Sequence, residues 1–109
     1  MADRIAVLAQ LDAAATTEET FYTVPALTQT TCSTLVVCNR TGAAKTFRVR
    51  IKVGGAANND KQFIYYDRSV AANDSLMTVI GMTLGEADVM VTYASATGLS
   101  FTLFGVETS

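Results

Sequence analysis

The segment Thr46-Phe47-Arg48-Val49-Arg50-Ile51-Lys52-Val53 decides the fold class of this chain, because polar and apolar side chains alternate along it without a break. Such strict alternation is typical of a β-strand with one face in a core and the other in water. Short apolar segments separated by turn residues recur from about residue 20 to the C-terminus. The sequence therefore predicts an all-β protein.

Turn signals divide the rest of the chain into short strands. Pro25 ends the first strand because proline cannot donate to a β-ladder, and Gly54 and Gly55 end the alternating segment because glycine permits a tight turn. The expected strands are residues 20–24, 30–39, 46–53, 61–70, 75–83, 89–94 and 99–106. Seven or eight antiparallel strands of this spacing predict one small β-sandwich of jelly-roll type over residues 20–109.

The N-terminal segment, residues 1–19, is open to more than one interpretation. Its Ala and Leu content would allow a helix, but the segment is short and has no capping signal. We expect an edge strand or an extended arm that leads into the sandwich. An arm of small residues can clasp a neighbouring subunit, or it can be a frayed terminus.

Residue parity predicts which side chains face the core. The expected inward set is Leu35, Val37, Phe47, Val49, Ile51, Val53, Val89, Val91, Tyr93, Leu99, Phe101 and Leu103. The segment 30–39 is also apolar on its other face, at Val36 and Cys38. Because a strand that is apolar on both faces is usually covered on both, we expect another subunit to cover this second face.

Composition limits the classes of partner. The net charge is −2 and the sequence pI is about 4.9, which argues against a dedicated nucleic-acid binder. The basic side chains of the alternating segment then form a solvated face that could at most meet an acidic partner locally. No apolar run is long enough to cross a membrane. No secretory leader is visible, so we expect the product to stay in the cytoplasm of the producing cell or to leave it by lysis.

Cys32 and Cys38 are six positions apart in one expected strand, which puts them on the same face. Their Cα atoms would then lie about 20 Å apart, whereas a disulfide needs about 7 Å or less. We therefore expect two free thiols. With no histidine in the chain, two cysteines also argue against a zinc site.

No catalytic arrangement is visible in the sequence. The absence of histidine removes the commonest general base and the nucleophile arrangements that depend on it. The carboxylates fall mostly in turns, where aspartate usually caps its own backbone. Calcium binding by such turns is a minor alternative, because the chain lacks a D-x-D-x-D-G loop. We expect a protein that is not an enzyme and has no cofactor.

Tyr65 and Tyr66 are adjacent and should point to opposite faces, one to the core and one to the surface. An exposed tyrosine beside Asp67 and Arg68 suits a protein–protein contact. Sugar stacking is a weaker alternative, because the chain has no tryptophan.

Several motifs occur in a familiar order: Tyr22-Thr23-Val24-Pro25-Ala26, Val37-Cys38-Asn39-Arg40, Val53-Gly54-Gly55-Ala56, Asp60-Lys61-Gln62, Tyr65-Tyr66-Asp67, Ala72-Asn73-Asp74 and the ending Leu99 to Glu107. Together they resemble small all-β virion structural proteins of tailed bacteriophages, over nearly the whole chain from about residue 20. The resemblance implies a non-enzymatic structural role, with no catalytic residues to carry over. Cys32 departs from the pattern, which usually has only the second cysteine.

Three functions follow as hypotheses. The first is a capsid decoration or cement protein on the outer shell. The second is a tail, collar or baseplate component, including a receptor-binding tip that recognises glycan, and the third is a small carbohydrate-binding module unrelated to phage. We expect a virion location and a homo-oligomer, most simply a trimer, that binds major capsid or tail proteins but neither nucleic acid nor membrane. The expected interface residues are Ile5, Val7, Leu8, Leu11, Val36, Cys38, Tyr66 and Arg68.

Overall fold

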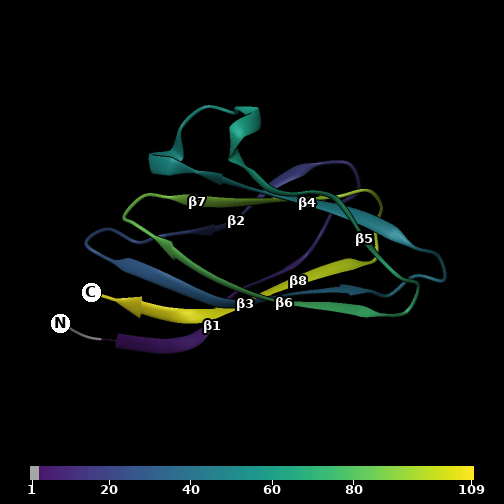
Figure 1. Ribbon diagram of the computed structural model, residues 1–109, viewed down its shortest axis with the longest axis horizontal. Coiled ribbons are helices and arrows are strands. Elements are labelled where there is room, and N and C mark those ends of the chain that lie inside the picture. Colours follow the sequence, from purple (N-terminus) through teal and green to yellow (C-terminus); the bar gives the residue numbers. More distant parts are fainter. Residues whose placement is uncertain (1–2) are drawn as a thin grey trace.

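The computed structural model describes residues 3–109, and β-strands dominate it (Figure 1). The strands are β1 (Asp3–Asp12), β2 (Glu18–Thr23), β3 (Gln29–Asn39), β4 (Lys45–Lys52), β5 (Phe63–Val70), β6 (Ser75–Leu84), β7 (Val89–Ala94) and β8 (Leu99–Thr108). Two 3₁₀ turns, η1 (Val53–Gly55) and η2 (Asp60–Gln62), lie between β4 and β5, and there is no α-helix within the described range. The predicted all-β class is confirmed.

The strands form two antiparallel sheets of four strands each. Sheet A has the order β1-β8-β3-β6, and sheet B has the order β2-β7-β4-β5. The two sheets pack face to face as the lower and upper layers of Figure 1. Every connection crosses from one sheet to the other except that from β4 to β5. Because β1 pairs with β8, the first and last strands of the chain lie side by side.

The inner faces of the two sheets share one core. Phe47 of sheet B and Phe101 of sheet A are fully buried, and their ring centroids are 5.9 Å apart. The predicted residues that the structure buries in this core are Leu35, Val37, Phe47, Val49, Leu99, Phe101 and Leu103. Val91 is buried as well, at 4% exposed, but it does not belong to this core cluster. Ile51 is partly buried against them. Strand parity was therefore reliable for β3, β4 and β8 over these positions.

The prediction for β7 was wrong in its parity. Its core-facing residues are Met90, Thr92 and Ala94, whereas Val89, Val91 and Tyr93 were expected there. The pairing with β4 sets this face, since Ala94 lies opposite the inward-facing Phe47. The run Val89-Met90-Val91 is apolar at both parities, so the sequence alone could not choose.

The prediction for Val53 was also wrong. This side chain is 73% exposed, because β4 ends one residue earlier and the chain enters η1 there. Gly54 takes a φ of 63° inside that turn, a left-handed conformation that glycine adopts readily. The turn carries Val53 out of the alternation of β4.

A register shift in β3 changes the orientation of the two cysteines. The pairing of β3 with both β6 and β8 slips between Cys32 and Thr34. One extra residue reverses the alternation at that point, so Cys32 is buried in the core while Cys38 lies half-buried on the outer face. The expectation that both face the same side was wrong, although both are free thiols. Burial raises the pKa of the Cys32 thiol to about 11.

Residues 3–12 form an edge strand of sheet A, which is one of the two alternatives for the N-terminal segment. Residues 1 and 2 of that segment lie outside the described residues. The neighbouring strand β8 approaches β3 closely at Gly105, where an added Cβ would lie 2.3 Å from the Thr31 carbonyl oxygen and 3.0 Å from Leu8 Cδ1. Only a residue without a side chain fits between these neighbours.

Candidate functional site

The outer face of sheet A is the most distinctive surface of the described molecule. It exposes large apolar side chains that a single sandwich leaves uncovered: Ile5 is 83% exposed, Val79 82% and Met77 70%. We call this surface the apolar face, and its members are Ile5, Val7, Val36, Met77, Val79, Phe104 and Val106. An exposed apolar patch of this kind marks an interaction site.

Strand register brings these side chains into continuous rows. Val7 of β1 lies opposite Phe104 of β8. Phe104 lies opposite Thr34 of β3, and Thr34 lies opposite Val79 of β6. Because side chains of directly paired residues on one face are neighbours, this row crosses all four strands. The apolar face is therefore one surface rather than a set of scattered residues.

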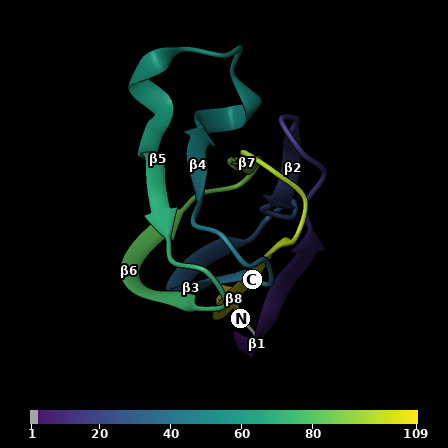
Figure 2. The ribbon, with the colours of Figure 1, turned by 90° about the vertical axis from the view of Figure 1, so that its right-hand side faces the viewer.

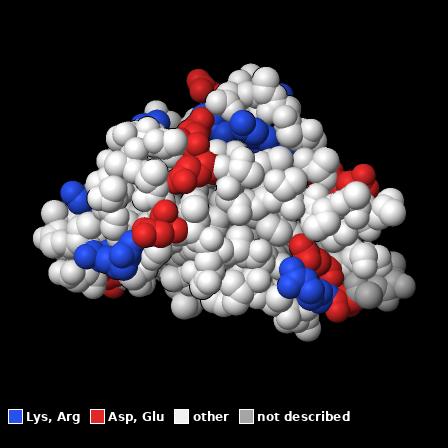
Figure 3. Space-filling view, turned by 180° about the vertical axis from the view of Figure 1, so that it is seen from behind, with Lys and Arg blue, Asp and Glu red and all other residues white. Residues whose placement is uncertain are grey.

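Charged side chains lie at the two ends of sheet A and not across its middle. At one end Arg40 Nη2 lies 2.5 Å from Asp12 Oδ1, and at the other Arg4 Nη2 lies 2.8 Å from Glu107 Oε1. Figure 3, which views the two sheets edge-on, shows blue and red groups at both ends of the lower half of the molecule. The apolar face is thus bordered by ion pairs, an arrangement typical of a protein interface with an apolar centre and a polar rim.

The structure brings together half of the predicted interface residues. Ile5, Val7, Val36 and Cys38 lie on the outer face of sheet A. Leu8 and Leu11 were predicted there too, but they pack against the core instead. The register shift between Val7 and Ala9 turns Leu8 inward.

Tyr66 and Arg68 belong to a different surface, since both lie on β5 in sheet B. Tyr66 is 59% exposed, and its neighbour Tyr65 packs against the core. The prediction that these two tyrosines face opposite sides is confirmed. The predicted interface residues are therefore divided between two sheets.

Sequence reasoning missed four members of the apolar face. Met77 and Val79 come from β6, and Phe104 and Val106 come from β8. The signal was present, because residues 103–106, and residues 76–80 apart from Thr78, are apolar at both parities just as residues 35–38 are. What the sequence did not contain is the strand order that makes these segments neighbours.

The outer face of sheet B holds a stack of arginine and aromatic side chains. The guanidinium of Arg48 lies 4.2 Å from the ring centroid of Tyr66 and 4.7 Å from that of Tyr93. Its Nε donates a hydrogen bond of 2.7 Å to Asp67 Oδ1, and its Nη2 donates one of 3.3 Å to Oδ2. The hydrogen bonds that Arg48 donates to Asp67 raise the pKa of Arg48 above its usual value. This cation is held by its neighbours through charge pairing and cation–π contact.

Arg50 corrects the expectation of a solvated basic face, because it is only 7% exposed. Its Nε lies 2.8 Å from Glu18 Oε2, and its Nη1 donates a hydrogen bond of 3.3 Å to Gln62 Oε1. Its guanidinium also lies 4.2 Å from the ring centroid of Phe63. The residues around η2 and the start of β5 therefore cover one end of this face.

A polar cluster centred on Tyr22 joins the two sheets. The Tyr22 hydroxyl, from sheet B, lies 2.8 Å from Thr30 Oγ1 and donates a hydrogen bond to Glu107, both in sheet A. Arg4 Nε donates a further hydrogen bond of 3.0 Å to Glu107. Burial, followed by the contact with Glu107, raises the pKa of Tyr22 to about 12. The same hydrogen bond from Tyr22, supported by Arg4, lowers the pKa of Glu107.

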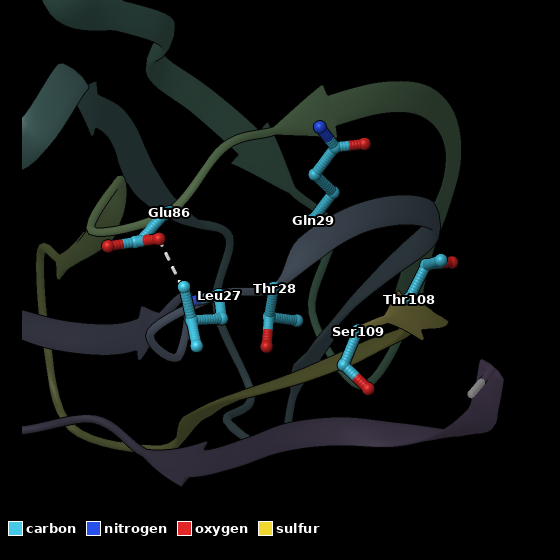
Figure 4. Close-up of a pocket in the computed structure, with 6 residues that line it drawn as sticks. All are labelled: Leu27, Thr28, Gln29, Glu86, Thr108 and Ser109. Carbon is cyan, nitrogen blue, oxygen red and sulfur yellow. Dashed lines mark hydrogen bonds between the residues drawn. The ribbon is translucent and has the colours of Figure 1, made fainter. Parts of the chain in front are cut away.

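A hollow of about 350 Å³ lies at one end of the sandwich (Figure 4). It is lined by Leu27, Thr28, Gln29, Glu86, Thr108 and Ser109. Its one acidic side chain, Glu86, accepts a hydrogen bond of 2.9 Å from the Leu27 backbone nitrogen. This carboxylate thus ties two loops together, which is a structural use of the group.

Residues 3–109 contain no cluster of three or more His, Cys, Asp or Glu side chains that could hold a metal ion. The same residues include no helix long and apolar enough to cross a membrane. Comparison with family models and with curated proteins finds no match to this chain.

Proposed function

We propose that this chain is a non-enzymatic structural protein of a bacteriophage virion, and specifically a capsid decoration protein that binds the outer shell. The observation that carries the proposal is the apolar face, which spans all four strands of sheet A and has ion pairs only at its ends. An uncharged surface on a rigid sheet suits permanent docking to another protein better than it suits chemistry.

We also propose that the fold is a jelly roll. The support is the strand order, in which β1-β8-β3-β6 faces β2-β7-β4-β5 and all pairs are antiparallel. Jelly rolls have eight strands in two sheets, and they are common in viral capsid and lectin domains. This topology supports a virion role and is equally compatible with recognition of a sugar.

The composition of the apolar face supports a protein as the partner. Phe104 and Met77 are residue types enriched at protein interfaces, and charged residues are depleted at interface centres. The resemblance of the motifs to small phage virion proteins favours a capsid or tail protein as that partner. A modest contact of this kind becomes strong when a symmetric particle presents it many times.

The proposal is tested by quantitative mass spectrometry of purified virions of the phage that encodes this chain. A copy number similar to that of the major capsid protein supports decoration. A copy number of a few dozen or fewer moves the assignment to the tail, collar or baseplate. Absence from purified particles contradicts a virion role, and a glycan-binding screen then tests the carbohydrate-binding hypothesis.

A further inference from the structure

Each sheet of the sandwich has two edge strands, and three of these four edge strands carry charged side chains that discourage pairing. Proteins protect exposed edges with charges, irregular backbone or short length. The edge strand β2 is six residues long and contains Glu18 and Glu19. The edge strand β5 contains Asp67, with a φ of 52°, and the charged Arg68.

The two edges of sheet A differ from each other. Strand β1 begins with Asp3 and Arg4, ends with Asp12, and has a register shift between Val7 and Ala9. Strand β6, Ser75–Leu84, is ten residues long and contains neither a charged residue nor a proline. Its own register shift lies between Val79 and Met82, where Gly81 has a φ of 49°. The strand pairs with β3 on one side, and no strand among the described residues pairs with its other side (Figure 2). Residues 75–79 of β6 are therefore a regular, uncharged stretch of sheet edge.

The side chains beside this edge are apolar on both faces of the sheet. Met77 and Val79 project from the outer face and are 70% and 82% exposed. On the inner side, Ile80 and Met82 lie beside Ile64 in a hollow of about 330 Å³ between β5 and β6. A strand added along β6 would satisfy the free backbone groups and place its own side chains beside both sets.

We infer that β6 is a self-association edge, along which two copies of this chain pair antiparallel about a two-fold axis, which gives a dimer in place of the trimer expected from the sequence. Two-fold pairing is the commonest symmetry of homo-oligomers, and it matches a surface with itself. An uncharged strand can pair with its own copy in this way, because no like charges are placed opposite each other. The dimer would extend sheet A across both copies and double the apolar face. This inference does not rest on the virion assignment.

The other edge of sheet A is a less suitable partner for β6. If β1 of a neighbouring copy paired with β6, then Asp3, Arg4 and Asp12 would find no charged partner on that strand. Such head-to-tail pairing also produces rings or open chains rather than a closed pair. The chemistry of the two edges favours β6 with β6.

Sedimentation velocity at micromolar concentration tests the inference with two matched variants. Val79→Lys places a charge on the outer face of β6, and Ile5→Lys makes the same change at an equally exposed position on β1. We expect wild type and Ile5→Lys to sediment as dimers and Val79→Lys to sediment as a monomer with an unchanged far-UV circular dichroism spectrum. A monomeric wild type, or a dimer that Val79→Lys leaves intact, would overturn the inference.

Single cysteines distinguish two-fold pairing from head-to-tail pairing. In a Cys38→Ser background, residues 76–80 are replaced by cysteine one at a time, and the protein is oxidised. A residue near the two-fold axis meets its own copy within disulfide range, so we expect at least one of these variants to form covalent dimers. If the protein is a dimer but none of the five cysteine variants forms a crosslink, two-fold pairing along β6 is ruled out.

Discussion

At the scale of single residues, the polar cluster around Tyr22 is the contact on which most depends. One hydroxyl serves both Thr30 and Glu107, so a single side chain of sheet B holds two strands of sheet A. A polar group that loses its partner in a buried site costs more than the bond itself contributes. The junction between the sheets is therefore sensitive to the loss of one oxygen atom.

Tyr22→Phe removes that oxygen while keeping the ring. We expect the free energy of unfolding to fall by about 1–3 kcal/mol, because Thr30 and Glu107 lose a partner. Urea denaturation monitored by circular dichroism measures the loss. The matched control is Tyr66→Phe at a 59% exposed position, which should change stability little. Equal stability of the two variants would contradict the role of the cluster.

The pH dependence of stability follows from the same residues. The folded state raises the pKa of Tyr22 from 10.0 to about 12 and that of Cys32 from 9.0 to about 11. Folding thus favours the neutral forms, so this stabilisation is complete below the ordinary pKa values and is lost as the pH rises through the folded ones. We expect urea midpoints to fall above about pH 9, and Tyr22→Phe should lessen the fall between pH 10 and 12.

At acid pH, stability is expected to fall as the pH decreases. The pKa of Glu107 is lowered in the folded state, so its contribution is present above the ordinary carboxyl pKa of 4.5 and is lost as the pH falls through the lower folded value. Glu107→Gln should flatten the acid branch of the urea midpoint against pH. An unchanged branch would show that other carboxylates dominate it.

At the scale of elements, register shifts between paired strands determine which side chains of sheet A face the core. Register shifts occur between Val7 and Ala9 in β1 and between Cys32 and Thr34 in β3. Gly105 in β8 lies beside both, with Leu8 and Cys32 among its closest neighbours. The register shifts in β1 and β3 fit on either side of β8 only because Gly105 has no side chain.

Gly105→Ala tests this arrangement. Its Cβ would lie 2.3 Å from a backbone oxygen, so the strands must move apart, and we expect a loss of stability of about 1–3 kcal/mol or more. Gly42→Ala is the control, because an added Cβ there meets nothing within 4 Å. Thermal unfolding of both variants measures the difference. A melting temperature for Gly105→Ala equal to that of Gly42→Ala would contradict the close approach.

The elements also show how far sequence reasoning reaches. The strict alternation of residues 46–52 identified the buried face of β4 correctly, because a polar side chain at every second position leaves one choice. The run Val89-Met90-Val91 left two choices, and pairing with β4 selected the unexpected one. The shift at Cys32 lies in a segment of Thr, Ser and Cys, which are tolerated on either face. Local pattern therefore predicted strands well and their irregularities poorly.

At the scale of the whole molecule, the candidate site depends on strand order. Val36 was identified by its excess of apolar neighbours in sequence, but its neighbours in space, Thr102 and Met77, come from β8 and β6. Pairing between strands distant in sequence depends on the total packing of both sheets. A sequence can thus suggest that an apolar surface exists without giving its extent.

Val36→Asp tests the function of that surface. The charge would be buried without a partner in a docked complex, so we expect binding to virions to weaken at least about tenfold, which corresponds to about 1.4 kcal/mol. Stability of the free protein should change little, because Val36 is only partly buried. Binding of labelled protein to particles that lack it, measured against Thr23→Asp in sheet B, provides the comparison. Equal binding of the two variants would exclude the apolar face as the docking site.

The pairing of β1 with β8 has a mechanical consequence. Asp3 lies opposite Thr108, so the start of β1 and the end of β8 lie together at one end of sheet A. Tension applied between the two ends would open this strand pair one hydrogen bond at a time, in the manner of a zipper, instead of shearing all of its bonds together. The molecule is therefore weak against a pull on its ends, however well it resists heat. A force applied through the outer face of sheet A would not act along the β1–β8 strand pair.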